Sequence, residues 1–286
     1  MIDADDLLSW ITGLYWGAML LMLGILLLVV FKAVPKGQRR WPALLVGIAV
    51  PALFIVPVVQ RLHQAKQQHD ERQARYLEAK AVFDEQCKTA GEKIYRTVEG
   101  VEGVMLLKVR GEKPYDPAKY DPKRDPMWED AAAAWDAEGD EYVFDFLKYL
   151  ANNSGARGYS YVDVRQADGN LVRYRGEWHP YHKPIERQPN PANPARYAIT
   201  YSNNVDPALR KYWVAGTTIQ IIDQQTHELL AEKTVFSFDS AQGSTATNRS
   251  PWRSTGTEVC PHALDHDRRT ITFVNKVLIP SSPVQP

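Results

Sequence analysis

Two uncharged apolar stretches near the start of the chain constrain its structure more than any other feature. They cover residues 7–31 and 41–59 of the 286 residues. About 20 apolar residues in a helix cross the roughly 30 Å hydrocarbon core of a bilayer, and both stretches approach or exceed that length. The second stretch contains Pro51 and Pro57, and a proline inside a membrane helix favours a kink. The sequence therefore predicts a two-helix transmembrane hairpin.

Basic residues near these stretches predict the orientation of the hairpin. The connecting turn, residues 32–40, holds four Lys or Arg residues, whereas residues 1–6 hold none. Because basic loops stay in the cytoplasm, the turn is predicted to be cytoplasmic and both termini periplasmic. The acidic leader and the long first stretch are unlike a cleaved signal peptide, whose apolar core has about 7–15 residues. We expect a multi-pass protein of the bacterial inner membrane.

The rest of the chain predicts a stalk followed by one folded domain. Residues 60–99 contain no Pro or Gly before Gly91, and this favours a long helix. From Tyr76 onward, apolar residues recur three or four positions apart, which is typical of a helix packed on a core. The expected segments are a hairpin, a helical stalk, a periplasmic domain and a disordered tail, at residues 1–60, 61–80, 81–280 and 281–286.

Strands are predicted where the apolar period changes from that of a helix to two. Residues 159–177 alternate around Asp168-Gly169, a dipeptide typical of a hairpin turn. Residues 196–202 and 216–239 predict three further strands, which would continue as an antiparallel meander. The predicted fold class is α+β, with an antiparallel meander sheet packed against helices.

The chain has two cysteines, Cys87 and Cys260. Both fall in the part predicted to be outside the cytoplasm, where thiols are oxidised, so a single disulfide is expected. The predicted apolar helix face directs Cys87 inward. Such a bond would close a long loop, to which the chain-entropy model assigns roughly 4–5 kcal/mol of stabilisation. Two unpaired structural cysteines are the alternative.

Charge and motifs exclude several classes of function. The sequence has 34 basic and 34 acidic residues, which is unlike the basic footprint of a nucleic-acid-binding protein. It has no GxSxG, HExxH, P-loop, dinucleotide or CxxC pattern, the short motifs that carry common chemistries. We therefore predict no catalytic residue, no cofactor and no nucleic-acid partner. A pair of distant carboxylates would leave no such pattern.

Two pairs of histidines are candidate metal ligands. His262 and His266 are four residues apart, a spacing that places two imidazoles on one helix face, and His179 and His182 flank Pro180-Tyr181. Neither pair brings a third ligand at a diagnostic spacing, and a disulfide would prevent Cys260 from acting as a thiolate ligand. No metal site is predicted, and His262 and His266 are the candidates that would form one.

Aromatic residues in the predicted loops indicate a surface for a partner. Trp178, Tyr181 and Trp252 lie in or near proline-rich or polar segments. Tyr and Trp side chains are enriched among the anchors of protein interfaces. The alternative is that these side chains pack in the core.

Several segments of the chain also carry a resemblance to a family. They are RKYWVAGTTIQIIDQQTHELLAEKTVFSFD, DPMW, GDEYVFDFL, Cys260-Pro261 and FVNKVLIP. In these segments the chain resembles a group of uncharacterised bacterial envelope proteins with the same layout of hairpin and domain. Some small membrane-anchored proteins of this layout are similar to immunity proteins encoded beside secreted antibacterial toxins.

The resemblance implies a membrane-anchored periplasmic binding protein that neutralises such a toxin or serves envelope assembly. Its partner would be a protein of the envelope or a toxin. The alternative function is an envelope enzyme with a dispersed site of His and carboxylate groups.

Overall fold

A computed structural model describes residues 17, 24–25, 28, 32, 40–111, 135–147, 158–176, 185–204, 206–244, 258–262 and 269–281. The chain divides into two compact units, Met1–Ala74 and Arg75–Pro286.

The main described element of the first unit is a long helix, α2 (Arg40–Cys87), of 48 residues, whose last turns belong to the second unit. Every side chain of residues 59–75 is exposed. The predicted helix over residues 60–99 is therefore right in its first part and wrong in its last. Helix α2 ends at Cys87 because a turn follows, in which the Thr89 hydroxyl donates to the Gln86 carbonyl at 2.8 Å. Shortly after this turn, Gly91 has a φ of 137°, which is outside the helical range.

The predicted transmembrane hairpin is wrong. Within the described part of the chain, no helix has both the length and the apolar character needed to cross a membrane. The prediction placed residues 41–59 in a membrane span from which a polar helix continues. In the structure they form the first part of α2, which continues into polar, exposed residues. Most of the other predicted span, residues 7–31, lies outside the described residues. The predicted multi-pass inner-membrane localisation, with both termini periplasmic, depended on this hairpin and is contradicted by the same finding.

The second unit is built on a nine-stranded sheet and a separate two-stranded sheet. The large sheet contains β1 (Gly91–Ile94), β3 (Gly103–Leu106), β4 (Tyr161–Arg165), β5 (Leu171–Arg175), β6 (Glu186–Pro189), β7 (Tyr197–Asn204), β8 (Val214–Asp223), β9 (Leu229–Phe238) and β10 (Val259–Cys260). Its order is β1-β9-β8-β7-β3-β4-β5-β6, and β10 also pairs with β9. The small sheet pairs β2 (Val98–Val101) with β11 (Leu278–Pro280).

The predicted class, α+β with an antiparallel meander, is wrong because the large sheet is mixed. Strand β3 lies between β7 and β4 and runs parallel to both. All four residues of β3 are buried, as expected for a parallel strand covered on both faces. The antiparallel hairpin of β4 and β5 around Gly169 is confirmed, and so is the antiparallel run of β7, β8 and β9.

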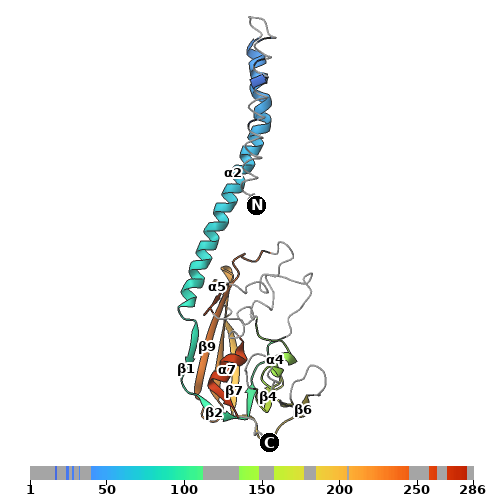
Figure 1. Cartoon of the computed structure of the whole chain (residues 1–286), viewed down its shortest axis with the longest axis vertical. Coiled ribbons are helices and arrows are strands. Elements are labelled where there is room, and N and C mark those ends of the chain that lie inside the picture. Colours follow the sequence, from blue (N-terminus) through green and yellow to red (C-terminus); the bar gives the residue numbers. More distant parts are fainter. Residues whose placement is uncertain are drawn as a thin grey trace, which may run out of the picture. The chain divides into compact units, whose positions relative to one another are not determined.

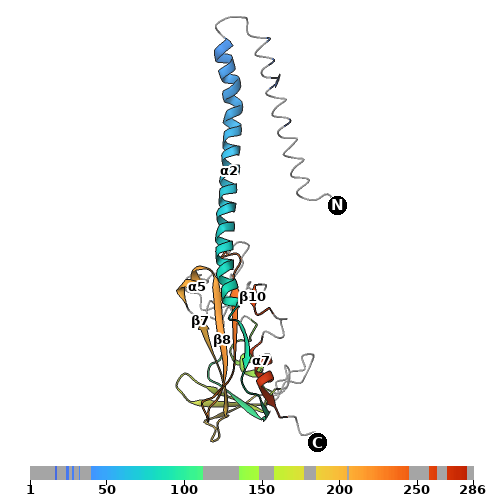
Figure 2. The same cartoon turned by 90° about the vertical axis from the view of Figure 1, so that its left-hand side faces the viewer.

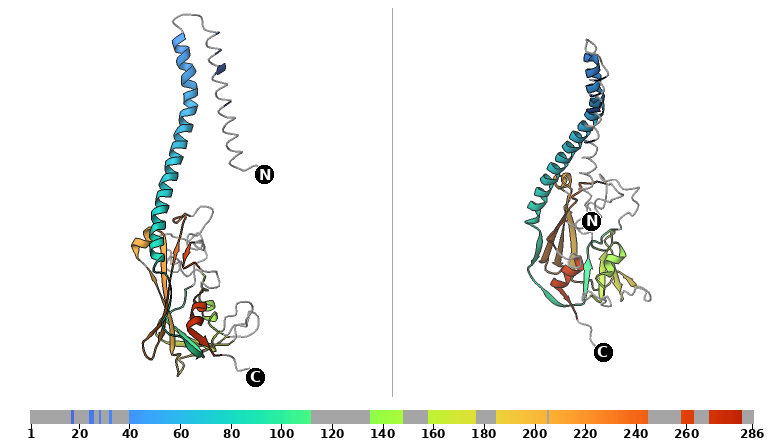
Figure 3. Two further views of the ribbon diagram at one scale, coloured as in Figure 1. Left: turned by 60° about the vertical axis from the view of Figure 1, so that its left-hand side comes forward. Right: turned by 45° about the horizontal axis from the view of Figure 1, so that its top comes forward.

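One face of the large sheet carries the main hydrophobic core. Two helices, α4 (Asp140–Phe144) and α7 (Thr270–Val277), lie on this side of the sheet (Figures 1 and 3). Their buried side chains include Tyr142, Phe273 and Val274, which pack against sheet residues such as Ile219 and Val162.

The opposite face is covered at one end by the last turns of α2 and by α5 (Pro207–Lys211) (Figure 2). The Phe83 ring stacks on Phe238 with centroids 5.6 Å apart, and the Tyr76 ring lies 5.9 Å from the same ring. The predicted apolar face of this helix is therefore confirmed from Tyr76 to Cys87.

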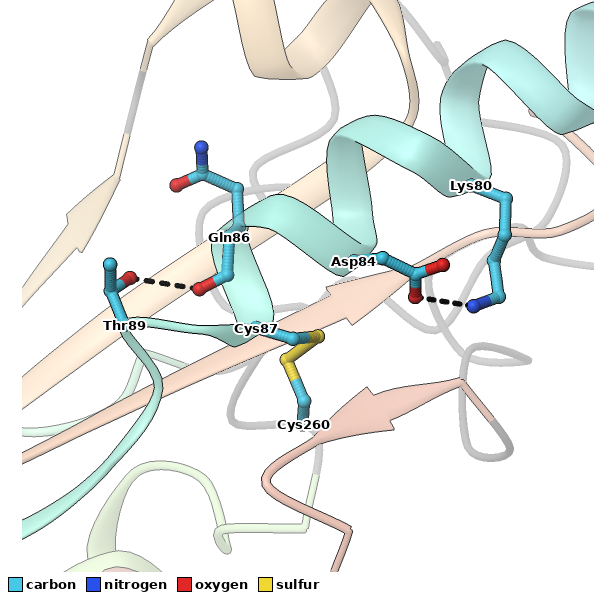
Figure 4. The surroundings of a disulfide bond; sticks show 6 residues. All are labelled: Lys80, Asp84, Gln86, Cys87, Thr89 and Cys260. Carbon is cyan, nitrogen blue, oxygen red and sulfur yellow. Dashed lines mark hydrogen bonds and ion pairs between the residues drawn. A yellow bond between two sulfur atoms is a disulfide. The ribbon is translucent and has the colours of Figure 1, made fainter.

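The Cys87–Cys260 disulfide is confirmed (Figure 4). The S–S distance is 2.08 Å and the two Cα atoms are 5.5 Å apart. Because Cys87 ends α2 and Cys260 lies in β10, the bond fastens the helix end to a strand that pairs with β9.

Candidate functional site

The structure places few of the predicted site residues. Trp178, Tyr181, Trp252 and His266 lie outside the described residues. His262 is described and exposed. Among the described residues, no group of three His, Cys, Asp or Glu side chains could hold a metal ion.

A different candidate site lies at the sheet edge formed by β1. We define the β1 edge as residues 92–95, and all four are exposed. Strand β1 is the first in the order of the large sheet and pairs with β9 on its inner side. Its outer side pairs with no strand of the described chain.

The main chain of the β1 edge directs hydrogen-bonding groups outward, where no strand of the described chain pairs with them. The Tyr95 N–H donates to the Leu230 carbonyl at 2.8 Å, so the main-chain N–H and C=O groups of Tyr95 point toward β9. Hydrogen-bonded and non-bonded pairs alternate along an antiparallel ladder. The N–H and C=O groups of Glu92 and Ile94 consequently point away from β9, outward from the sheet.

On one face of the sheet, Lys93 and Tyr95 converge on a single carboxylate. Lys93 Nζ is 2.9 Å from Glu232 Oε1, and the Tyr95 hydroxyl donates to the same oxygen at 3.2 Å. The hydrogen bond from Lys93 lowers the pKa of Glu232, and the same bond raises the pKa of Lys93. Lys93 and Glu232 therefore form an ion pair of opposite charges on this face, and Tyr95 hydrogen-bonds to the same carboxylate.

On the other face, Glu92 lies between two ammonium groups. Its carboxylate is 3.1 Å from Lys233 Nζ and 2.9 Å from Lys276 Nζ of α7. Burial acts to raise the pKa of Glu92, but the two lysines outweigh it and hold this pKa below its usual range. Lys233 is itself buried, so these contacts connect β1 with the core side of the sheet.

The β1 edge also exposes apolar surface. The large hydrophobic side chains that are exposed among the described residues of the second unit are Leu77, Ile94 and Tyr95. The last two are adjacent, with 42% and 57% of their surface exposed. Because successive residues of a strand face opposite sides of the sheet, Ile94 adds apolar surface on one face of the β1 edge and Tyr95 on the other. Both lie beside main-chain groups that pair with no strand of the described chain.

Covalent and polar contacts hold the β1 edge at both ends. The disulfide at Cys87 lies shortly before β1 and anchors its start. After its end, the Arg96 N–H donates to the Leu230 carbonyl at 3.1 Å. The Arg96 guanidinium is 3.3 Å from Asp223 and 3.0 Å from Glu228. The strand is thus fixed in an extended form before any partner arrives.

A second polar cluster, around Arg110, serves a structural purpose. Arg110 is fully buried, lies 3.5 Å from the centroid of the Tyr201 ring and pairs with Asp136 at 3.4 Å. Asp136 also accepts hydrogen bonds from the Thr270 N–H at 2.7 Å and its hydroxyl at 2.6 Å. Because Thr270 begins α7, this cluster fixes the helix against the sheet.

The sequence reasoning missed the β1 edge, because the helix predicted over residues 60–99 covered it. After Gly91, the residues Glu92, Lys93, Ile94 and Tyr95 alternate in the side of the sheet they face. In a strand, residues two apart share a face. Four residues are too few to distinguish that period from a helical one.

Comparisons with protein-family models, with curated proteins and with solved structures found no match to this chain. Function has to be inferred from the geometry of the chain itself.

Proposed function

We propose that this protein binds another protein and that the β1 edge is its contact surface. One observation carries the proposal. At the β1 edge, the exposed side chains of Ile94 and Tyr95 adjoin main-chain groups that point outward without a described partner. Apolar and aromatic anchors beside oriented polar groups are what a protein interface requires.

The identity of the partner is a further prediction. The resemblance in the sequence implies a secreted antibacterial toxin, which would make this an immunity-like protein. The β1 edge supports binding of a polypeptide and is compatible with a toxin as that polypeptide.

The enzyme alternative stays a prediction without a described site. Of the four histidines named for it, His179, His182 and His266 lie outside the described residues, and His262 is exposed.

A crosslinking experiment tests the proposal. A photoreactive amino acid replaces Tyr95 in the full-length chain in its own cells, and a matched variant carries it at Ala208, an exposed position on α5. We expect irradiation to join a defined protein to the variant at position 95 and not to the one at position 208. The same adduct from both positions, or none from position 95, would contradict the proposal.

Purified partner then allows a quantitative test. Tyr95→Ala should weaken binding by about 1–3 kcal/mol, the cost typical of an interface anchor. The free energy of unfolding should change little, because Tyr95 is exposed.

A further inference from the structure

We infer that the β1 edge binds an extended segment of its partner as an added antiparallel strand, and that this segment carries an acidic residue next to an apolar one. The inference rests on the proposed function and specifies the mode of binding and the chemistry of the partner.

The main chain indicates strand addition. Glu92 and Ile94 each direct one N–H and one C=O outward, which is the pattern that an added antiparallel strand completes. Because the strand is held at Cys87 and at Arg96, little conformational entropy is lost when a segment pairs with it.

The opposite edge of the sheet shows how this chain closes an edge. In β6, the Asn190 N–H donates to the Leu171 carbonyl at 2.8 Å. By the same alternation, Pro189, which pairs with Val172, occupies an outward position and offers no N–H there. Proline at such a position blocks pairing with another strand. The equivalent outward position in β1 is Ile94, which keeps its N–H.

Charge argues against a second copy of this chain as the added strand. Pairing Glu92 with Ile94 of the second copy would satisfy the outward groups of both. It would also place Lys93 directly opposite the second copy's Lys93. Like charges directly opposite each other destabilise a strand pair.

The same position selects an acidic residue in the partner. Lys93 would face a non-hydrogen-bonded position, where opposing Cα atoms are only about 4.5 Å apart. Its side chain is 65% exposed, and its ion-pair partner among the described residues, Glu232, lies on β9, on the inner side of β1. A carboxylate in the added strand would approach the same ammonium from the outer side. The neighbouring residue of the segment would cover Ile94 and is therefore apolar.

Two synthetic peptides of equal length provide the probe. One has alternating Thr and Val around a central Val-Glu-Val, and the other has Lys in place of Glu. Binding to the full-length protein is followed by the fluorescence anisotropy of the labelled peptide. We expect the Glu peptide to bind at least about tenfold more tightly than the Lys peptide. We also expect this ratio to fall toward one in Lys93→Gln.

Ile94→Pro tests the main-chain pairing. The Ile94 N–H does not bond to β9, so the substitution repeats what Pro189 already does in β6 and should leave thermal unfolding nearly unchanged. Binding of the Glu peptide should fall at least about tenfold, whereas the matched control Ile94→Val should retain it. Methylating the peptide's main-chain nitrogens on the paired side should have the same effect as the proline.

Several outcomes would overturn the inference. They are binding that ignores Ile94→Pro in a folded protein, equal affinity for both peptides, and no measurable binding of either. Self-association that Ile94→Pro abolishes would instead assign the edge to a second copy. Crosslinking from position 95 that persists alongside any of these outcomes would leave protein binding standing while strand addition fails.

Discussion

At the scale of single residues, the buried carboxylate of Asp136 joins segments that are far apart in the chain. It pairs with Arg110, which follows β3 in the chain, and accepts two hydrogen bonds from Thr270 of α7. We predict that Asp136→Ala lowers the free energy of unfolding by about 3–5 kcal/mol, because it removes a buried carboxylate that contacts both the Arg110 guanidinium and Thr270. Denaturant unfolding measures this.

The matched control for the Asp136→Ala substitution breaks an exposed ion pair. This pair joins Arg187 to Asp140, whose side chains are 53% and 50% exposed. Arg187→Ala should cost less than about 1 kcal/mol. An Asp136→Ala variant no less stable than this control would show that the cluster does not fix α7.

The raised pKa of Asp145, at the end of α4, predicts that the stability of the protein depends on pH. Burial raises the pKa of its carboxyl to about 6, although Arg269 acts in the opposite direction. Between about pH 4 and pH 6 the folded chain therefore holds a proton that the unfolded chain has lost, and stability from this group falls as the pH rises. Asp145→Asn should remove this dependence.

We compare the two proteins by subtracting the free energy of unfolding of the original chain from that of Asp145→Asn. This difference should be about 1–3 kcal/mol larger at pH 7 than at pH 4. Urea unfolding at the two pH values measures the difference. Parallel pH profiles for the two proteins would show that the carboxyl titrates as in the unfolded chain.

At the scale of elements, the disulfide joins the end of α2 to β10 and lies just before the β1 edge. Its two cysteines are 173 residues apart in the sequence. The chain-entropy model for a loop of this length assigns about 5 kcal/mol, so the double substitution Cys87→Ala, Cys260→Ala should lower the free energy of unfolding by about that amount.

A reductant should destabilise the original chain to a similar extent and leave the double variant unchanged. Equal unfolding midpoints for the original chain and the double variant would mean that the packing of Phe83 on Phe238 holds α2 without the bond.

Elements differ in how far the sequence reveals them. The inward face from Tyr76 to Cys87 was predictable because helical spacing is local, and the β4–β5 hairpin because Asp168-Gly169 is a local turn signal. The place of β3 between β7 and β4 was not, because strand order depends on contacts between distant segments. The β1 edge was missed since four residues carry little periodicity, and Trp178, Tyr181 and Trp252 remain predictions.

At the scale of the whole molecule, the central claim is that an open sheet edge in the second unit receives an extended segment of a partner. Residues 92–95 contribute main-chain groups, an apolar side chain and an ammonium group to one short strand. The strand at the other end of the order, β6, carries Pro189 at an outward position and so lacks an N–H there.

Amide hydrogen exchange at the β1 edge tests this claim most directly. In the free full-length protein, the N–H groups of Glu92 and Ile94 should exchange rapidly, while that of Tyr95, bonded to Leu230, is protected. With saturating Glu peptide, exchange at Glu92 and Ile94 should slow at least about tenfold and exchange at Tyr95 should stay the same. Unchanged exchange at Glu92 and Ile94 in the presence of bound peptide would contradict the claim.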